Sequence, residues 1–164
     1  VDPKVVEQVT KAVRKVTDKP VIVKLSPNVT DIVEIAKAVE AGGGDGVSLI
    51  NTILGMAIDI HRRKPVLGNI YGGLSGPAVK PVALRMVHQV YKGVNIPIMG
   101  LGGIMTGTDA IEFMMAGAQA VQVGVATMVD PTAISRIARE MGDYVEQYNL
   151  NSITDIVGAV HQEK

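Results

Sequence analysis

The sequence predicts an α/β fold: four parallel strands, each followed by a helix, forming the C-terminal half of a (β/α)₈ TIM barrel. Three observations lead to this prediction. Short β-branched runs alternate with amphipathic segments, the spacing of the strands fits βα units, and polar residues and glycines recur where the strands end. The chain has 164 residues, whereas a complete barrel takes about 250. We therefore expect residues 1–164 to be one half of a domain whose N-terminal half lies upstream.

The first part of the chain predicts helix, strand, helix and strand. Valines recur at helical spacing over residues 3–18, where Pro3 suits a first turn. The short β-branched run that follows, KPVIVKLS, is typical of a buried strand. The next segment, NVTDIVEIAKAVEAGG, places its apolar side chains on one helical face and ends in a glycine pair, and GVSLIN predicts the second strand.

The second part repeats this pattern after a long insertion. The third and fourth strands are predicted in PIMGLG and AVQVGVAT, with helices over residues 78–91, 107–116 and 131–148 and a short closing segment at 152–160. The strands therefore end near Ser26, Asn51, Gly102 and Thr127. The middle spacing is twice the others, which predicts a long loop after Asn51 that either covers a ligand or is a solvated surface excursion.

Four parallel strands can also form a small open sheet. The half barrel is favoured because the distinctive residues fall at carboxyl strand ends, which form a single mouth in a barrel and carry its active site. A half barrel alone would expose two strand edges and its inner face. For this reason we expect a second half to cover them.

Composition excludes several classes of function. Lysine plus arginine equals aspartate plus glutamate, 16 against 16, which gives no electrostatic reason for a nucleic-acid or anionic-membrane partner. No apolar run reaches the ~18 residues of a membrane span. The chain has no cysteine, and its three histidines show no metal-binding spacing. A cytoplasmic location is expected.

Glycines mark the ends of the last two predicted strands. Gly102 and Gly103 follow the third strand, and Gly124 lies in the fourth, immediately before Val125. Main-chain N–H groups at such turns attract a phosphate, and barrels commonly bind phosphate after their last two strands. The alternative is that these glycines only make tight turns. The sequence favours a phosphate site.

Lys24 is an unusual residue for the middle of a parallel strand. Alternation puts it on one face with Ile22 and Ser26. A lysine buried inside a barrel requires a negative partner or water. That partner is either a ligand on which negative charge develops or a carboxylate across the barrel in a structural ion pair.

Two further sets of residues lie at predicted strand ends or in the insertion. Asn51 and Thr52 end the second strand, where they either read a planar ligand by hydrogen bonds or cap a turn. In the segment YGGLSGPAVKP, Ser75 suits the cap of the next helix and Gly76 permits close backbone approach.

Several long strings in this sequence resemble the dihydroorotate dehydrogenase family. They are VKLSPNVTDI, LINTILGMAIDI, GNIYGGLSGPAVKPVALRMV, IPIMGLGGI and EFMMAGAQAVQVGVAT. The wording of NTILGMAID and GGLSGPA is similar to the NAD-linked class 1B branch. The resemblance extends over residues 1–160 and implies the C-terminal half of an FMN-binding barrel.

The resemblance implies a function and a role for each candidate residue. The family oxidises dihydroorotate to orotate in pyrimidine biosynthesis, passing a hydride to FMN while a base removes a proton. Lys24 would lie by the flavin and Ile50 and Gly76 would contact it. Asn51 and Thr52 would hold the substrate. The phosphate would be held by Gly102, Gly103, Gly124 and Val125.

Two departures from the family pattern bear on activity. Relatives often have threonine at the position of Val125, so one phosphate hydrogen bond is expected to be missing. The catalytic base of this branch is a cysteine in the N-terminal half, as are a lysine and an asparagine that bind substrate. We therefore expect no catalytic base within residues 1–164 and no activity from them alone.

The resemblance also implies partners. The class 1B enzyme passes electrons to NAD through a second subunit that carries FAD and a 2Fe–2S cluster, and a homodimer within a heterotetramer is expected. Two other interpretations stay open at this point. One is a related FMN barrel that acts on dihydropyrimidines, and the other is a non-catalytic half-barrel assembly module.

Overall fold

A parallel four-stranded sheet forms the centre of the computed structural model, which describes residues 1–161. Its strands lie in the order β1–β2–β7–β8, so each strand pairs with the strand of the next βα unit in the chain. Their bounds are β1 (Ile22–Leu25), β2 (Gly46–Leu49), β7 (Ile98–Leu101) and β8 (Ala120–Gln122). The predicted α/β class with four parallel strands is confirmed, and the architecture is consistent with part of a (β/α)₈ barrel.

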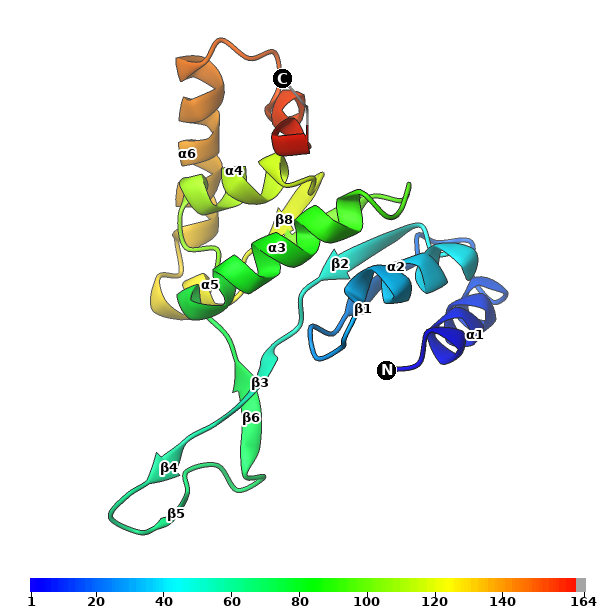
Figure 1. Ribbon diagram of the computed structural model, residues 1–164. Coiled ribbons are helices and arrows are strands. Elements are labelled where there is room, and N and C mark those ends of the chain that lie inside the picture. The colour runs from blue at the N-terminus through cyan, green and yellow to red at the C-terminus, as the bar shows by residue number, and fades with distance from the viewer. Residues whose placement is uncertain (162–164) are drawn as a thin grey trace.

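Helices connect these strands and lie mainly on one side of the sheet (Figure 1). They are α1 (Pro3–Arg14), α2 (Ile32–Ala41), α3 (Lys80–Tyr91), α4 (Gly107–Met115), α5 (Val125–Val129) and α6 (Ala133–Gln147), with 3₁₀ turns η1 (Pro77–Val79), η2 (Ile153–Ile156) and η3 (Ala159–His161). Side chains start three of the helices: Asp2, Asp31 and Thr106 each accept a hydrogen bond from a main-chain amide of the first turn.

The two faces of the sheet differ in burial. The helix-covered face carries Leu25, Leu49 and Ile98, each at most 2% exposed. The only phenylalanine, Phe113 of α4, is fully buried against this face, where a side chain at Gly100 would collide with it. On the opposite face Ile22 is 49% exposed. Alternation along the strands therefore separates a packed face from an open one.

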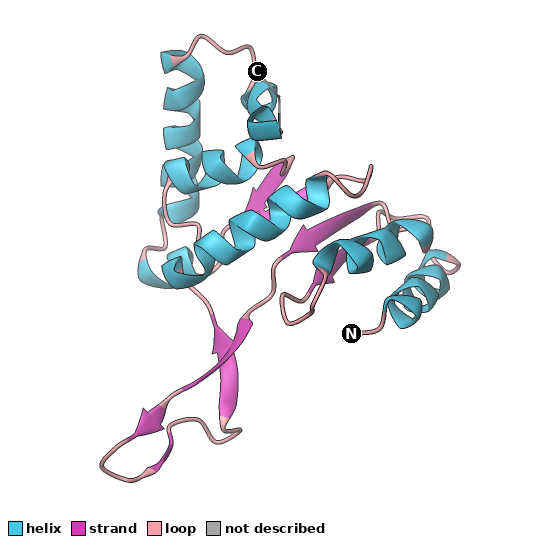
Figure 2. Ribbon diagram, in the orientation of Figure 1, coloured by secondary structure: helices cyan, strands magenta, loops and turns pink. Residues whose placement is uncertain are grey.

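The long insertion after β2, expected as a long loop, is a β-hairpin. β3 (Ile53–Met56) pairs antiparallel with β6 (Tyr71–Leu74), and the short β4 (Ile58–Asp59) and β5 (Lys64–Pro65) pair at its tip. The hairpin projects away from the helices and the main sheet (Figure 2). The strands have glycines and mixed polarity, so alternation gave no clear signal for them.

Two predicted element ends are wrong. The fourth strand ends at Gln122 and not at Thr127, because the amide and hydroxyl of Thr127 both donate to the Gly124 carbonyl and turn the chain into α5. Gly124 therefore follows the strand. The first helix ends at Arg14 rather than at residue 18. The guanidinium of Arg14 donates to the Thr17 and Lys19 carbonyls and closes a turn there.

The end of the described chain packs on the Tyr91 ring at the end of α3. Gly117 and Gly158 both have positive φ, and a Cβ on either would overlap the Tyr91 side chain. The Gly158 amide donates to the Met114 carbonyl at 3.0 Å, and the His161 ring lies 4.6 Å from Tyr91 between centroids. These contacts hold the 3₁₀ turns against α3 and α4.

We expect Gly117→Ala to lower the free energy of unfolding by about 2–4 kcal/mol, because overpacking against Tyr91 and an unfavourable φ add together. The matched control is Gly142→Ala in α6, where an added Cβ meets nothing within 4 Å. This change should raise the free energy of unfolding by about 0.5–1 kcal/mol. Urea denaturation followed by circular dichroism measures both, and equal shifts in one direction would contradict the packing argument.

Candidate functional site

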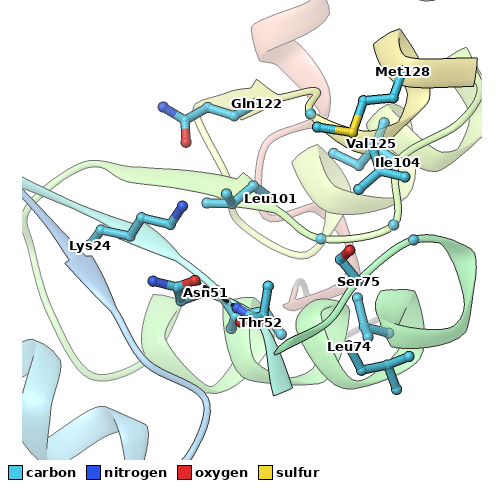
Figure 3. A pocket seen from close by; sticks show the side chains of 16 residues that line it. Lys24, Asn51, Thr52, Leu74, Ser75, Leu101, Ile104, Gln122, Val125 and Met128 are labelled. Carbon is cyan, nitrogen blue, oxygen red and sulfur yellow. Dashed lines mark hydrogen bonds between the residues drawn. The ribbon is translucent and has the colours of Figure 1, made fainter. Parts of the chain in front are cut away.

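The carboxyl ends of the sheet strands open onto one cavity of about 230 Å³ (Figure 3). Parallel strands bring their following loops to one edge of the sheet, so residues far apart in sequence meet there. All the residues with a predicted role lie in its wall: Lys24, Ile50, Asn51, Thr52, Gly76, Gly102, Gly103, Gly124 and Val125. Lys24 and both glycine turns thus face the same space, as the barrel interpretation requires.

Lys24 lies on the open face of β1 and points toward the cavity (Figure 3). It is exposed, which differs from the expectation of a buried lysine, because β1 is the edge strand of the described sheet. No carboxylate in residues 1–161 pairs with its ammonium group. The structural ion pair that was the alternative for Lys24 is therefore not present in the described part of the chain.

The segment after β2 is fixed by main-chain hydrogen bonds to its two neighbours in the sheet. The Ile50 amide donates to the Leu101 carbonyl at 2.8 Å, and the Asn51 amide donates to the Leu25 carbonyl at 3.0 Å. The Asn51 side-chain oxygen accepts from the Thr52 amide at 2.8 Å. The side chains of Asn51 and Thr52 are held at the rim beside Lys24 (Figure 3).

Asn28 supports this segment, and the sequence analysis did not identify it. Its side-chain Nδ2 donates to the Thr52 carbonyl at 3.0 Å, and its Oδ1 accepts from the Leu54 amide at 3.0 Å. Asn28 thereby ties the loop after β1 to the base of the hairpin. Its place two residues after Ser26, at a strand end, was the available signal.

The glycine pair after β7 has a structural reason as well as a possible binding role. Gly102 and Gly103 have φ of +128° and +78°, which side chains rarely adopt. A Cβ at Gly103 would lie 2.7 Å from the Gly76 carbonyl oxygen, and one at Gly102 would lie 2.9 Å from the Ala83 Cβ. The tight-turn explanation therefore holds for this pair, and it brings two loops into main-chain contact.

Gly124 differs, because a Cβ there meets nothing within 4 Å and would enter the cavity. Among residues 1–161, no acceptor is found for the main-chain amides of Gly103, Gly124 and Val125. Three unpaired donors beside open space are suited to an anion. Ser75 also lines the cavity, but its side chain makes no cap for η1.

Asp109 braces the loop that carries the glycine pair. Its carboxylate accepts from the Met105 and Thr106 amides, both at 2.9 Å, and pairs with Lys80 Nζ at 2.6 Å. Burial alone raises the pKa of Asp109, but hydrogen bonds from Lys80, Met105 and Thr106 outweigh it and hold the pKa below its usual value. The carboxylates of Asp109 and then Glu112 in turn raise the pKa of Lys80.

Arg136 of α6 also contacts this loop. It donates to the Met105 carbonyl at 3.1 Å and pairs with Glu140 at 2.9 Å and Asp130 at 3.4 Å. Glu140 also accepts from the Gly107 amide. The hydrogen bonds from Gly107 and then Arg136 lower the pKa of Glu140.

Several cavity residues had no sequence signal of a role. Leu101 and Gln122 are register partners on neighbouring strands, so their shared position follows only from the sheet pairing. Ile104 and Met128 add apolar wall, with Met128 exposed on α5. They give the cavity an apolar side facing the polar rim.

Two other kinds of site are not found in the described residues. Over residues 1–161, no three side chains of histidine, cysteine, aspartate or glutamate come together in a way that would hold a metal ion. None of the helices there combines the length and apolar character that crossing a bilayer requires.

Comparisons with known proteins point to one family. The family model described as dihydroorotate dehydrogenase matches residues 1–145. Proteins named dihydroorotate dehydrogenase B (NAD(+)), catalytic subunit, are 62% identical over 96% of this chain in Alkaliphilus oremlandii and 63% identical over 94% of it in Desulforamulus reducens. Those matches cover 52% and 51% of the two relatives. The chain thus spans about half the length of the curated relatives it matches.

The low pKa of Asp109 predicts a loss of stability in acid. Because the pKa is lower in the folded state than in the unfolded one, the carboxylate stabilises the fold above the ordinary aspartate value near 3.8, and this contribution disappears as the pH falls through and below it. We expect Asp109→Asn to lower the free energy of unfolding at pH 6. Between pH 5 and pH 3 the free energy of unfolding of this variant should fall less than that of the wild type.

Urea denaturation across this pH range tests the prediction. Asp143→Asn is the control, because Asp143 is exposed on α6 and makes no ion pair among residues 1–161. A difference between wild type and Asp109→Asn that stays constant from pH 6 to pH 3 would refute the assignment.

Proposed function

The chain belongs to the dihydroorotate dehydrogenase family, and from this premise we propose that its complete protein oxidises dihydroorotate to orotate with bound FMN, in pyrimidine biosynthesis. We propose further that residues 1–164 form the C-terminal half of the FMN-binding barrel domain. The observation that carries the proposal is the single cavity lined by every residue to which the sequence assigned a role. The names of the relatives support the activity. We propose a cytoplasmic location as well.

The residues present fit FMN. At one end of the cavity, unpaired amides of Gly103, Gly124 and Val125 would hold the phosphate, and the space beside Gly124 leaves room for it. Val125 contributes its amide but no hydroxyl. Gly76, whose φ is +89°, would lie against the cofactor by its main chain. The bound cofactor would supply a two-electron acceptor.

Lys24 would provide the positive charge at the other end. Its ammonium points into the cavity and has no carboxylate partner in residues 1–161, so its charge is available to a ligand. A fixed cation stabilises negative charge that develops in a reaction more than it stabilises a neutral ground state. Lys24 would therefore favour reduction of the cofactor ring, and Ile50 would support that ring by main-chain contacts.

Asn51 and Thr52 would orient the pyrimidine substrate. Both stand on the rim beside Lys24, and amide and hydroxyl groups match the alternating donors and acceptors of a pyrimidine ring. The hydrogen bonds from Asn28 would keep this segment in place. The family resemblance implies that a cysteine removes the substrate proton, and since residues 1–164 contain none, we propose that this base lies in another part of the complete protein.

The name shared by the relatives, a NAD(+)-linked catalytic subunit, supports a separate electron-transfer subunit. We propose that this partner carries FAD and a 2Fe–2S cluster and delivers electrons to NAD. A homodimer of catalytic subunits within a heterotetramer completes the proposal.

The decisive experiment follows the visible absorbance of the flavin in the purified full-length protein under anaerobic conditions. Dihydroorotate should bleach the flavin rapidly, and dihydrouracil should not. Bleaching by dihydrouracil alone would instead identify a dihydropyrimidine-reducing relative. A folded full-length protein that binds no flavin would identify an assembly module and overturn the proposal.

We expect Lys24→Ala to slow reduction of the flavin by dihydroorotate by about 10²-fold, the usual effect of removing one stabilising charge or donor. Because Lys24 makes no ion pair within residues 1–161, its loss breaks none there, and the unfolding midpoint is measured beside the rate. Lys19→Ala is the matched control, because Lys19 lies just before the opposite end of the same strand. Stopped-flow reduction rates that are the same for both variants would remove Lys24 from the mechanism.

A further inference from the structure

We propose that Arg136 is a positioning residue for phosphate binding, acting from behind the two loops that supply the amide donors. This inference rests on the proposed function. Arg136 does not line the cavity. It lies on α6, and its guanidinium contacts both the loop after β7 and the turn after α5. Its role would be to hold these two segments at the separation that one phosphate group requires.

The donors come from two segments that the sheet alone does not fix. Gly103 belongs to the loop between β7 and α4, whereas Gly124 and Val125 begin the segment that becomes α5. Main-chain hydrogen bonds hold each strand to its neighbour only as far as Leu101 and Gln122. Beyond those residues, other contacts must set the distance between the donors.

Arg136 supplies that connection through two of its nitrogens. Its Nη2 donates to the Met105 carbonyl at 3.1 Å, two residues after Gly103. Its Nε lies 3.4 Å from the carboxylate of Asp130, the residue directly after α5, and this carboxylate also accepts from the Thr132 amide at 2.9 Å. A planar guanidinium can meet a carbonyl and carboxylates together, which the single ammonium of a lysine cannot do equally well.

Two carboxylates complete the brace around the same loop. Glu140 pairs with Arg136 at 2.9 Å and accepts from the Gly107 amide, and Asp109 accepts from the Met105 amide at 2.9 Å. Arg136 thus holds the loop from Gly103 to Gly107 by the Met105 carbonyl, and the two carboxylates hold it by the main-chain amides of Met105 and Gly107. Arg136 is the member of this group that also reaches the α5 side, through Asp130.

The test compares the affinities of FMN and riboflavin for the full-length apoprotein, measured by flavin fluorescence. Riboflavin lacks the phosphate, so the ratio of the two affinities isolates the phosphate contribution. The wild type should prefer FMN. Arg136→Gln should weaken FMN binding about tenfold, as for one lost charge-assisted hydrogen bond, with riboflavin binding nearly unchanged.

Arg139→Gln is the matched control. It makes the same change on the same helix, at an exposed residue with no ion pair among residues 1–161. It should leave the affinity ratio at the wild-type value. Arg136→Lys keeps the charge and should give an intermediate ratio, and it also serves if Arg136→Gln fails to fold.

The outcomes separate the two proposals. An unchanged ratio in the Arg136 variants, with or without equal loss of both affinities, would overturn the positioning role and leave a purely structural one. A wild-type protein without preference for FMN over riboflavin would instead overturn phosphate binding, and with it the proposed function.

Discussion

The main-chain contact between two loops, at Gly76 and Gly103, is the constraint on which the cavity depends. A single methyl group at Gly103 would lie 2.7 Å from the Gly76 carbonyl oxygen and 2.9 Å from the Lys80 nitrogen. Because the loops meet without side chains between them, α3 and α4 begin side by side and their charged residues can pair. The Lys80–Asp109 ion pair, at 2.6 Å, then joins the first turns of these two helices. The glycines therefore shape the wall of the site before they serve any ligand.

Local sequence patterns predicted most of the fold because the sheet strands and helices carry their signals within a few residues. Alternation at Ile22 and Lys24 gave the correct face of β1, and Thr106 with Asp109 forms the capping box that starts α4 where the sequence placed it. The pattern failed where polarity alternates weakly, as in the hairpin. It also failed after Gln122, where a hydrogen bond from Thr127 to the Gly124 carbonyl replaces a strand with a helix.

The candidate site was predictable in part for a different reason. The ends of β1, β2 and β7 are visible in the sequence, and a parallel sheet collects such ends at one edge, so Lys24, Asn51 and Gly102 could be grouped without coordinates. The supporting layer could not be grouped in this way. Arg136 contacts Met105 across 31 residues of chain, and Asn28 reaches Thr52 across 24, and neither residue belongs to a motif. The exposure of Lys24 also depended on which surfaces cover the inner face of the sheet.

The arrangement of the amide donors and of the charged residues that hold their loops has a consequence for protein engineering. The amide donors of Gly103, Gly124 and Val125 alternate along the chain with the charged residues that support their loops, and Gly76, which contacts Gly103, begins the stretch that Glu140 ends. Neither set can be cut out without the other. Transplanting the amide donors into a different scaffold would therefore mean moving residues 76–140 as one block. If the glycine turns were grafted alone, their loops would lose the contacts that fix their conformation.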